Sequence, residues 1–64
     1  MAYEVKYDDG ITQWSAFFES QDEALTQAAH DVNTYGGVPA QEVVDDTGTQ
    51  VVDQAGIVQA ADEI

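Results

Sequence analysis

Residues 20–35 have the sequence SQDEALTQAAHDVNTY, and this stretch decides the fold. Ser20 and Glu23 fit a capping box, in which the serine hydroxyl accepts from the amide of Glu23 and the Glu23 side chain returns to the amide of Ser20. Apolar side chains then recur at three- and four-residue spacing along one stripe, formed by Leu25, Ala28, Ala29, Val32 and Tyr35. Gly36-Gly37 and Pro39 end the pattern. We expect one amphipathic helix whose stripe packs against a second layer.

The residues before this helix predict a β-hairpin. Tyr3, Val5 and Tyr7 recur with the two-residue period of a half-buried strand. Asp8-Asp9-Gly10 is a turn signal, because glycine accepts a positive φ. Residues 11–18 predict a second strand that is apolar on both faces, one formed by Trp14, Ala16 and Phe18 and the other by Ile11, Gln13, Ser15 and Phe17. We expect part of this strand to be covered by the C-terminal tail or by another copy of the chain.

The residues after the helix predict a second hairpin. Ala40 to Asp45 and Thr49 to Asp53 are rich in valine and flank the turn Asp46-Thr47-Gly48. The tail from residue 54 onward is ambiguous, because its apolar residues fit one face of a short helix while Gly56-Ile57-Val58 also fits a strand. We expect an α+β domain over residues 1–64 in ββαββ order, with an antiparallel sheet of about four strands and the helix packed on one face.

Charge is the unusual property of the composition. Thirteen Asp and Glu side chains stand against one basic side chain, Lys6, and the formal net charge is −12. Such a surface repels DNA, RNA and anionic membranes and attracts basic proteins. We therefore expect a basic nucleic-acid-binding protein or complex as the partner, with no direct binding to nucleic acid or membrane. The chain itself is expected to be a monomer or a small homo-oligomer.

Several kinds of chemistry are disfavoured by what the sequence lacks. There is no cysteine, which excludes disulfides and thiolate metal sites, and a single histidine, His30, does not make a zinc site within one chain. No nucleophile motif accompanies His30, so we expect no catalytic residues, no metal and no cofactor. Residues 1–5 lack the basic and apolar regions of a secretion signal, and no apolar run reaches the length of about 20 residues that a membrane helix needs. These features predict a cytoplasmic protein, in the host cytoplasm if the chain is phage-encoded.

The carboxylates have two competing interpretations. In the first, turns and helix starts favour Asp and Glu locally, although this leaves the scarcity of Lys and Arg unexplained because ordinary surfaces mix both signs. In the second, the carboxylates imitate phosphates, with spacings of roughly 7 Å along one face of a strand and roughly 5–6 Å along a helix. The candidate partner-binding residues are then Asp8, Asp9, Glu19, Asp22, Glu23, Asp31, Glu42, Asp45, Asp46 and Asp53.

In size, lack of cysteine, scarcity of Lys and Arg and compact α/β pattern, the chain resembles small acidic phage-encoded anti-defence proteins. The resemblance is to anti-CRISPR proteins and anti-restriction DNA mimics in particular, and it lies in composition over the whole chain. It implies a non-enzymatic inhibitor that occupies the DNA-binding channel of a Cascade-type or restriction complex.

A second resemblance implies an alternative. Val5 with Tyr7, Trp14, the helix start Asp22-Glu23-Ala24, and residues 42–48 are similar to small uncharacterised bacterial and archaeal ββαββ domains. The chain would then be a housekeeping domain from a salt-loving organism, and its acidity would serve solubility in high salt. The absence of arginine and the abundance of glutamine depart from halophilic composition and place this alternative second.

Salt is expected to stabilise the fold. Like charges repel one another in the compact state, and added ions screen this repulsion over a Debye length of about 10 Å at 0.1 M. Thermal unfolding followed by circular dichroism should show a midpoint that rises from low to moderate NaCl. A flat or falling midpoint would mean that the carboxylates are too dispersed to affect stability.

Overall fold

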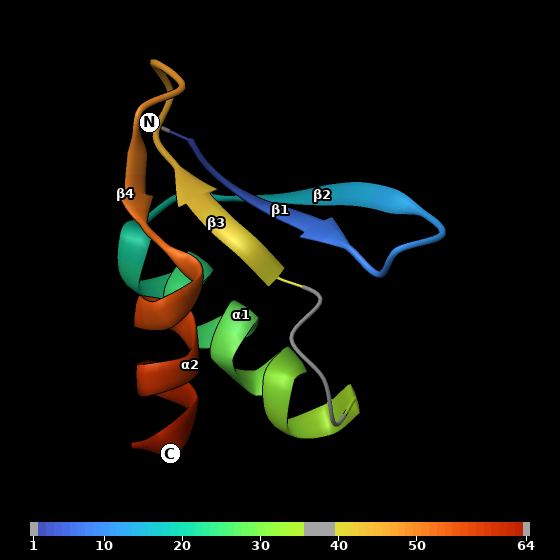
Figure 1. The fold of residues 1–64 in the computed structure, drawn as a ribbon. Helices are drawn as coiled ribbons and strands as arrows, with labels where there is room; N and C mark the ends of the chain where they lie inside the picture. The colour runs from blue at the N-terminus through green and yellow to red at the C-terminus, as the bar shows by residue number, and fades with distance from the viewer. Residues whose placement is uncertain (1, 36–39, 64) are drawn as a thin grey trace.

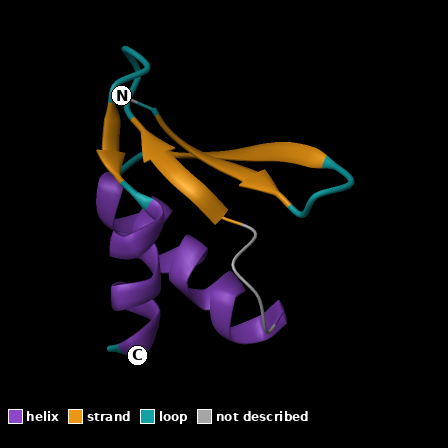
Figure 2. Ribbon diagram, in the orientation of Figure 1, coloured by secondary structure: helices purple, strands orange, loops and turns teal. Residues whose placement is uncertain are grey.

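The computed structural model describes residues 2–35 and 40–63, which form two layers (Figures 1 and 2). A four-stranded sheet makes one layer, and two helices lie together on one of its faces. The elements in chain order are β1 (Tyr3–Asp8), β2 (Gln13–Phe18), α1 (Gln21–Tyr35), β3 (Ala40–Val44), β4 (Gln50–Val52) and α2 (Gln54–Asp62). The predicted α+β class with an antiparallel sheet is confirmed, and the observed order is ββαββα.

The two hairpins form one sheet because β1 pairs with β3. The strand order is β2-β1-β3-β4, and every neighbouring pair is antiparallel. Helix α1 connects β2 to β3 across one face of the sheet (Figure 1). The sequence pattern did not determine how the chain crosses from the first hairpin to the second. The pairing of β1 with β3 makes both of them central strands and leaves β2 and β4 at the two edges.

The core lies between the central strands and the helices. Val5 and Val43 are fully buried where β1 pairs with β3, and Ala24 and Ala28 of α1 pack against them. Leu25, expected within the buried stripe, is only partly buried, and so is Val32 of the same predicted set. The helix is therefore rotated so that its smallest side chains meet the sheet. The side chain of Tyr35, along with Gly36-Gly37 and Pro39, lies outside the described residues.

The ambiguous tail is a helix. Asp53 is the N-cap of α2, and its Oδ1 accepts from the amide of Gly56 at 2.8 Å. Ile57 is fully buried in the core, and α2 packs against α1 and β3. A Cβ on Gly56 would lie 2.9 Å from Cγ1 of Val52, so glycine permits the helix to start this close to β4. As a helix, the tail buries Ile57 and Ala61.

The strands are shorter than predicted, because carboxylates bind the backbone amides at their ends. Ile11 and Thr12 lie in the turn and not in β2, since both of their amides donate to Oδ1 of Asp9. Gly10 occupies the predicted turn with a φ of 89°. At the second hairpin, Thr49 likewise donates its amide to Asp45 and lies outside β4. Local hydrogen bonds to aspartate therefore set where pairing in the sheet begins.

Replacing Ile57 with alanine should destabilise the fold by about 2–5 kcal/mol, because the change leaves a cavity between α2 and the sheet. Ile57 is 0% exposed, whereas Ile11 is 94% exposed and provides the matched control. Ile11→Ala should change the free energy of unfolding by no more than about 0.5 kcal/mol. Urea unfolding of the two variants measures both values, and equal losses would show that α2 is not docked.

Candidate functional site

The β1–β2 turn carries two carboxylates in fixed positions. Oδ1 of Asp8 accepts from the amide of Gly10 at 2.8 Å. Oδ1 of Asp9 accepts from the amides of Thr12 at 2.7 Å and Ile11 at 2.9 Å. The donation from Thr12, followed by that from Ile11, holds the pKa of the Asp9 carboxyl below its usual value. The Asp9 carboxyl therefore keeps its negative charge down to a lower pH than an ordinary aspartate does.

The β3–β4 turn is built in the same way around Asp45. Its Oδ1 accepts from the Thr47 hydroxyl at 2.6 Å, the Thr47 amide at 2.9 Å and the Thr49 amide at 3.0 Å. The Thr47 hydroxyl is the main cause, with the Thr49 amide second, of a pKa below the usual value for Asp45. Asp46 is exposed beside it. This second turn is a second fixed anionic tip.

The helix starts hold a further group of candidate residues. Oγ of Ser20 accepts from the amide of Glu23 at 3.1 Å, as the capping box predicts. The return bond from the Glu23 side chain is not formed within the described part of the chain. Glu19, Asp22 and Glu23 are all exposed at this end of α1, where negative charge favours the helix dipole. Asp53 serves α2 as its N-cap.

Asp31 and Glu42 differ from the other candidates in their surroundings. Asp31 is half-buried on α1, and its carboxylate accepts from the Tyr7 hydroxyl at 2.7 Å and from Nε2 of Gln27 at 2.9 Å. It joins the helix to the sheet. Glu42 lies on the sheet face that the helices do not cover, where it accepts from Nε2 of Gln50 at 3.2 Å. Asp31 thus has a structural partner, while Glu42 is available on the surface.

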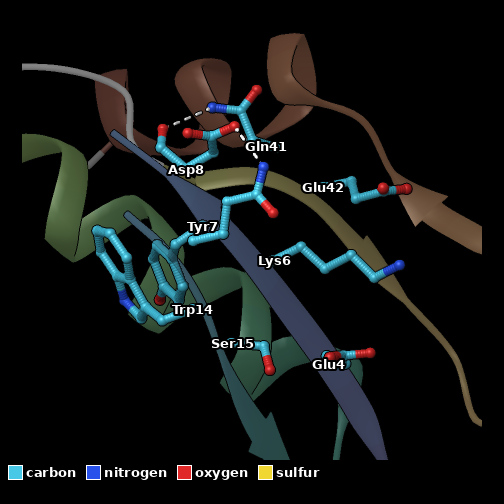
Figure 3. A pocket seen from close by; sticks show the side chains of 9 residues that line it. Glu4, Lys6, Tyr7, Asp8, Trp14, Ser15, Gln41 and Glu42 are labelled. Atoms are coloured by element: carbon cyan, nitrogen blue, oxygen red, sulfur yellow. Dashed lines mark hydrogen bonds between the residues drawn. The ribbon is translucent and has the colours of Figure 1, made fainter. Parts of the chain in front are cut away.

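The open face of the sheet brings together three carboxylates and the one lysine. Glu4, Lys6 and Asp8 alternate with the core residues of β1, and Glu42 lies directly opposite Lys6 on β3. Figure 3 shows these side chains around a shallow depression. Lys6 forms no ion pair with any described residue. Glu4 was not among the predicted site residues, although its alternation with Val5 could have placed it here.

The ten candidate residues do not gather on one face. The two hairpin turns lie at different corners of the molecule, and the start of α1 lies at the opposite end of β2 from the β1–β2 turn (Figure 1). Asp8 and Glu42 share the open face of the sheet, whereas Asp31 lies on the helical side. The candidate carboxylates therefore form several separate groups on different sides of the domain.

Aromatic side chains of β2 accompany this acidic surface. The Trp14 ring stacks on Tyr7 with a centroid distance of 5.3 Å and an angle of 4° between the rings. Trp14 remains 43% exposed and Phe17 is 68% exposed. The candidate site was chosen by charge, which does not select Trp14 or Phe17. The sequence signal that could have found them is that residues 11–18 are apolar on both faces of the predicted strand.

The described residues hold no group of three histidine, aspartate or glutamate side chains arranged to bind a metal ion. His30 is exposed on α1, with Nδ1 3.4 Å from Oγ1 of Thr34. Neither α1 nor α2, as far as the structure describes them, has the length and apolar character needed to cross a bilayer.

Comparisons with protein-family models, curated proteins and solved structures find no match to this chain.

Asp45→Asn should remove a pH-dependent part of the stability. A folded-state pKa below the usual 3.8 means that the contribution of Asp45 is fully present above the unfolded-state pKa. It is lost as the pH falls from about 4 through the folded-state value. The difference in unfolding free energy between wild type and Asp45→Asn should therefore shrink over this range.

The control for this measurement is Asp46→Asn, at an exposed neighbour outside the hydrogen-bonded turn cluster. Urea unfolding at a series of pH values gives the difference for each variant, and carbon NMR titration of the Asp45 carboxyl gives its pKa directly. A pKa at or above 3.8 for Asp45 would contradict the role assigned to the turn.

Proposed function

We propose that this chain is a non-enzymatic acidic binding protein that occupies the nucleic-acid-binding surface of a basic partner. The observation that carries the proposal is the pair of surface carboxylates, exposed Asp9 and half-buried Asp45, held in place by backbone amides at the hairpin turns. Because the turn already orders these side chains, a partner would not have to immobilise them on binding. Fixed anions on a rigid scaffold are what phosphate mimicry requires.

The open face of the sheet adds anions at a suitable spacing. Glu4 and Glu42 are diagonal neighbours on paired strands, since Glu4 lies opposite Val44. Diagonal neighbours of this kind lie roughly 7–8 Å apart, comparable with successive phosphates along a strand. Arginine and lysine side chains that track a nucleic-acid backbone would find charge-assisted acceptors here. The resemblance in composition to anti-CRISPR and anti-restriction proteins makes a Cascade-type or restriction complex, in a host cytoplasm, the first target to test.

One observation favours the alternative of a halophilic housekeeping domain. The acidic groups lie at two turns, at the start of α1, on the open sheet face and on the helical side, and do not form a single contact face. A surface whose charge serves solubility in high salt has this distribution, because every side of the molecule meets the same solvent. The two functions differ in whether the position of a carboxylate matters or only the total charge.

A competition assay tests the proposed function. The chain is immobilised, proteins of the host lysate are captured and identified, and the captured protein is purified. Labelled duplex DNA bound to that protein should then be released by the free chain, as measured by fluorescence anisotropy, and the release should weaken as salt rises. A captured protein that keeps its DNA affinity in the presence of saturating chain would overturn the proposal.

Charge-reversal variants distinguish position from total charge. Asp45→Lys with Asp46→Lys should reduce the release of DNA at least tenfold, measured at a temperature where circular dichroism shows the domain still folded without the Asp45 turn hydrogen bonds. The matched control is Asp62→Lys with Glu63→Lys, which makes the same change in net charge at exposed residues near the end of α2. Equal effects from the two pairs would mean that only total charge acts, as the halophilic alternative predicts.

A further inference from the structure

The longer edge of the sheet is the one formed by β2. In the strand order β2-β1-β3-β4, β2 has six residues with one side unpaired by any described strand, whereas β4 at the other edge has three. An unpaired side presents a row of backbone N–H and C=O groups that another extended chain can join. None of the six residues is buried, and α2 packs against α1 and β3. The expected cover from the tail is therefore missing over Phe17, which is 68% exposed.

This edge lacks the usual protection against pairing. Native edge strands are blunted by lysine, proline, charged inward side chains or β-bulges. Residues 13–18 have the sequence QWSAFF, with no charge and no proline, and their register with β1 is regular throughout. The pairs β1·β3 and β3·β4 each contain a register shift. The longer of the two open edges, β2, is thus the one whose pairing in the sheet is regular.

The side chains of β2 offer anchors on both faces. Phe17 projects on the open face opposite Glu4, and Trp14 lies on the helical face opposite Tyr7, against which it stacks. A chain paired with β2 would have alternate side chains beside Phe17 and beside Trp14. Aromatic faces of this kind accept aliphatic stems and guanidinium groups. The strand therefore provides backbone pairing together with side-chain contacts.

The open edge of β2 could pair with a second copy of this chain or with an extended segment of a different partner, and charge distinguishes the two. A second copy would bring a net charge of −12 against another −12, which opposes pairing. A basic segment would be attracted, and carboxylates stand at both ends of β2: Asp8 and Asp9 at its start and Glu19 just after its end. The strand itself carries no charge. The complementary chain is extended, apolar in its middle and basic at its ends.

We propose that the β2 edge binds an extended, lysine- or arginine-flanked segment of the partner by antiparallel or parallel strand addition. The inference rests on the proposed function for one property, that the partner is basic. Six residues of β2 span about 20 Å at 3.3 Å per residue, so the segment has a similar length. Strand addition would supply the fixed geometry that attraction between charges lacks.

Two synthetic peptides test the edge. The first has lysines at both ends and valines and threonines in its middle, over roughly eight residues, which is enough to span β2. The second has the same sequence with N-methyl groups on alternate backbone amides, made in both registers, so that its charge is kept while strand pairing is blocked. Isothermal titration calorimetry should show at least tenfold tighter binding of the first peptide, and the amides of β2 should gain hydrogen-exchange protection only with it.

Paired variants locate the contact. Phe17→Ser should weaken binding of the unmethylated peptide several-fold, whereas Ile11→Ser, an exposed apolar residue outside β2, should not. Hydrogen exchange at Val5 and Val43 confirms that both variants keep the core. If Phe17→Ser and Ile11→Ser behave alike, β2 is not the contact.

The remaining outcomes separate this inference from the proposed function. Equal affinity for the methylated and unmethylated peptides overturns strand addition, while release of DNA from a basic partner could still succeed. Failure of DNA release with intact peptide pairing overturns the proposed function alone. A dimer in sedimentation experiments whose β2 amides are protected without peptide would show that a second copy occupies the edge, and the inference would be wrong.

Discussion

The contact between the alanine face of α1 and the centre of the sheet is the interaction on which the structure depends. Ala24 and Ala28 are fully buried against the strand pair that contains Val5 and Val43. Such small side chains let the helix backbone come close to the sheet, but they fill little volume. Ile57 of α2 completes the core from a second direction. The small core accepts no charge, and none of its buried residues is polar among those described.

Because the core, as far as it is described, holds no charged side chain, the carboxylates lie on the surface, and several of them belong to turns and helix caps. Asp9, Asp45 and Asp53 each bind amides where a strand or helix begins or ends. Each therefore stabilises local structure and adds to the surface charge. The local and the functional interpretations of the acidity are compatible for these residues, because a turn that holds a carboxylate also presents it. Glu4 and Glu42 have no such local role and lie on the open face of the sheet.

Much of the fold could be predicted from periodicity, because the alternation around Val5 and the helical spacing from Ser20 to Val32 are strong local signals. Leu25, predicted as a core residue, packs against the core but is only partly buried, whereas Ala24, which was not in the predicted stripe, is fully buried. Helix α2 was one of two alternatives for the tail, and the choice between helix and strand depends on the packing around Ile57. For the site, turn carboxylates were recognisable, but their separation into different corners depends on the pairing of β1 with β3.

That pairing also orders events while the chain is being made. Glu4 lies opposite Val44, forty positions later in the sequence, so β1 must wait for most of the chain before its second neighbour exists. Until then the first hairpin has two open edges and an uncovered apolar face, a combination that favours association between nascent chains. Asp8, Asp9, Glu19, Asp22 and Glu23 are all translated before β3. These charges would oppose association between neighbouring nascent chains during this interval.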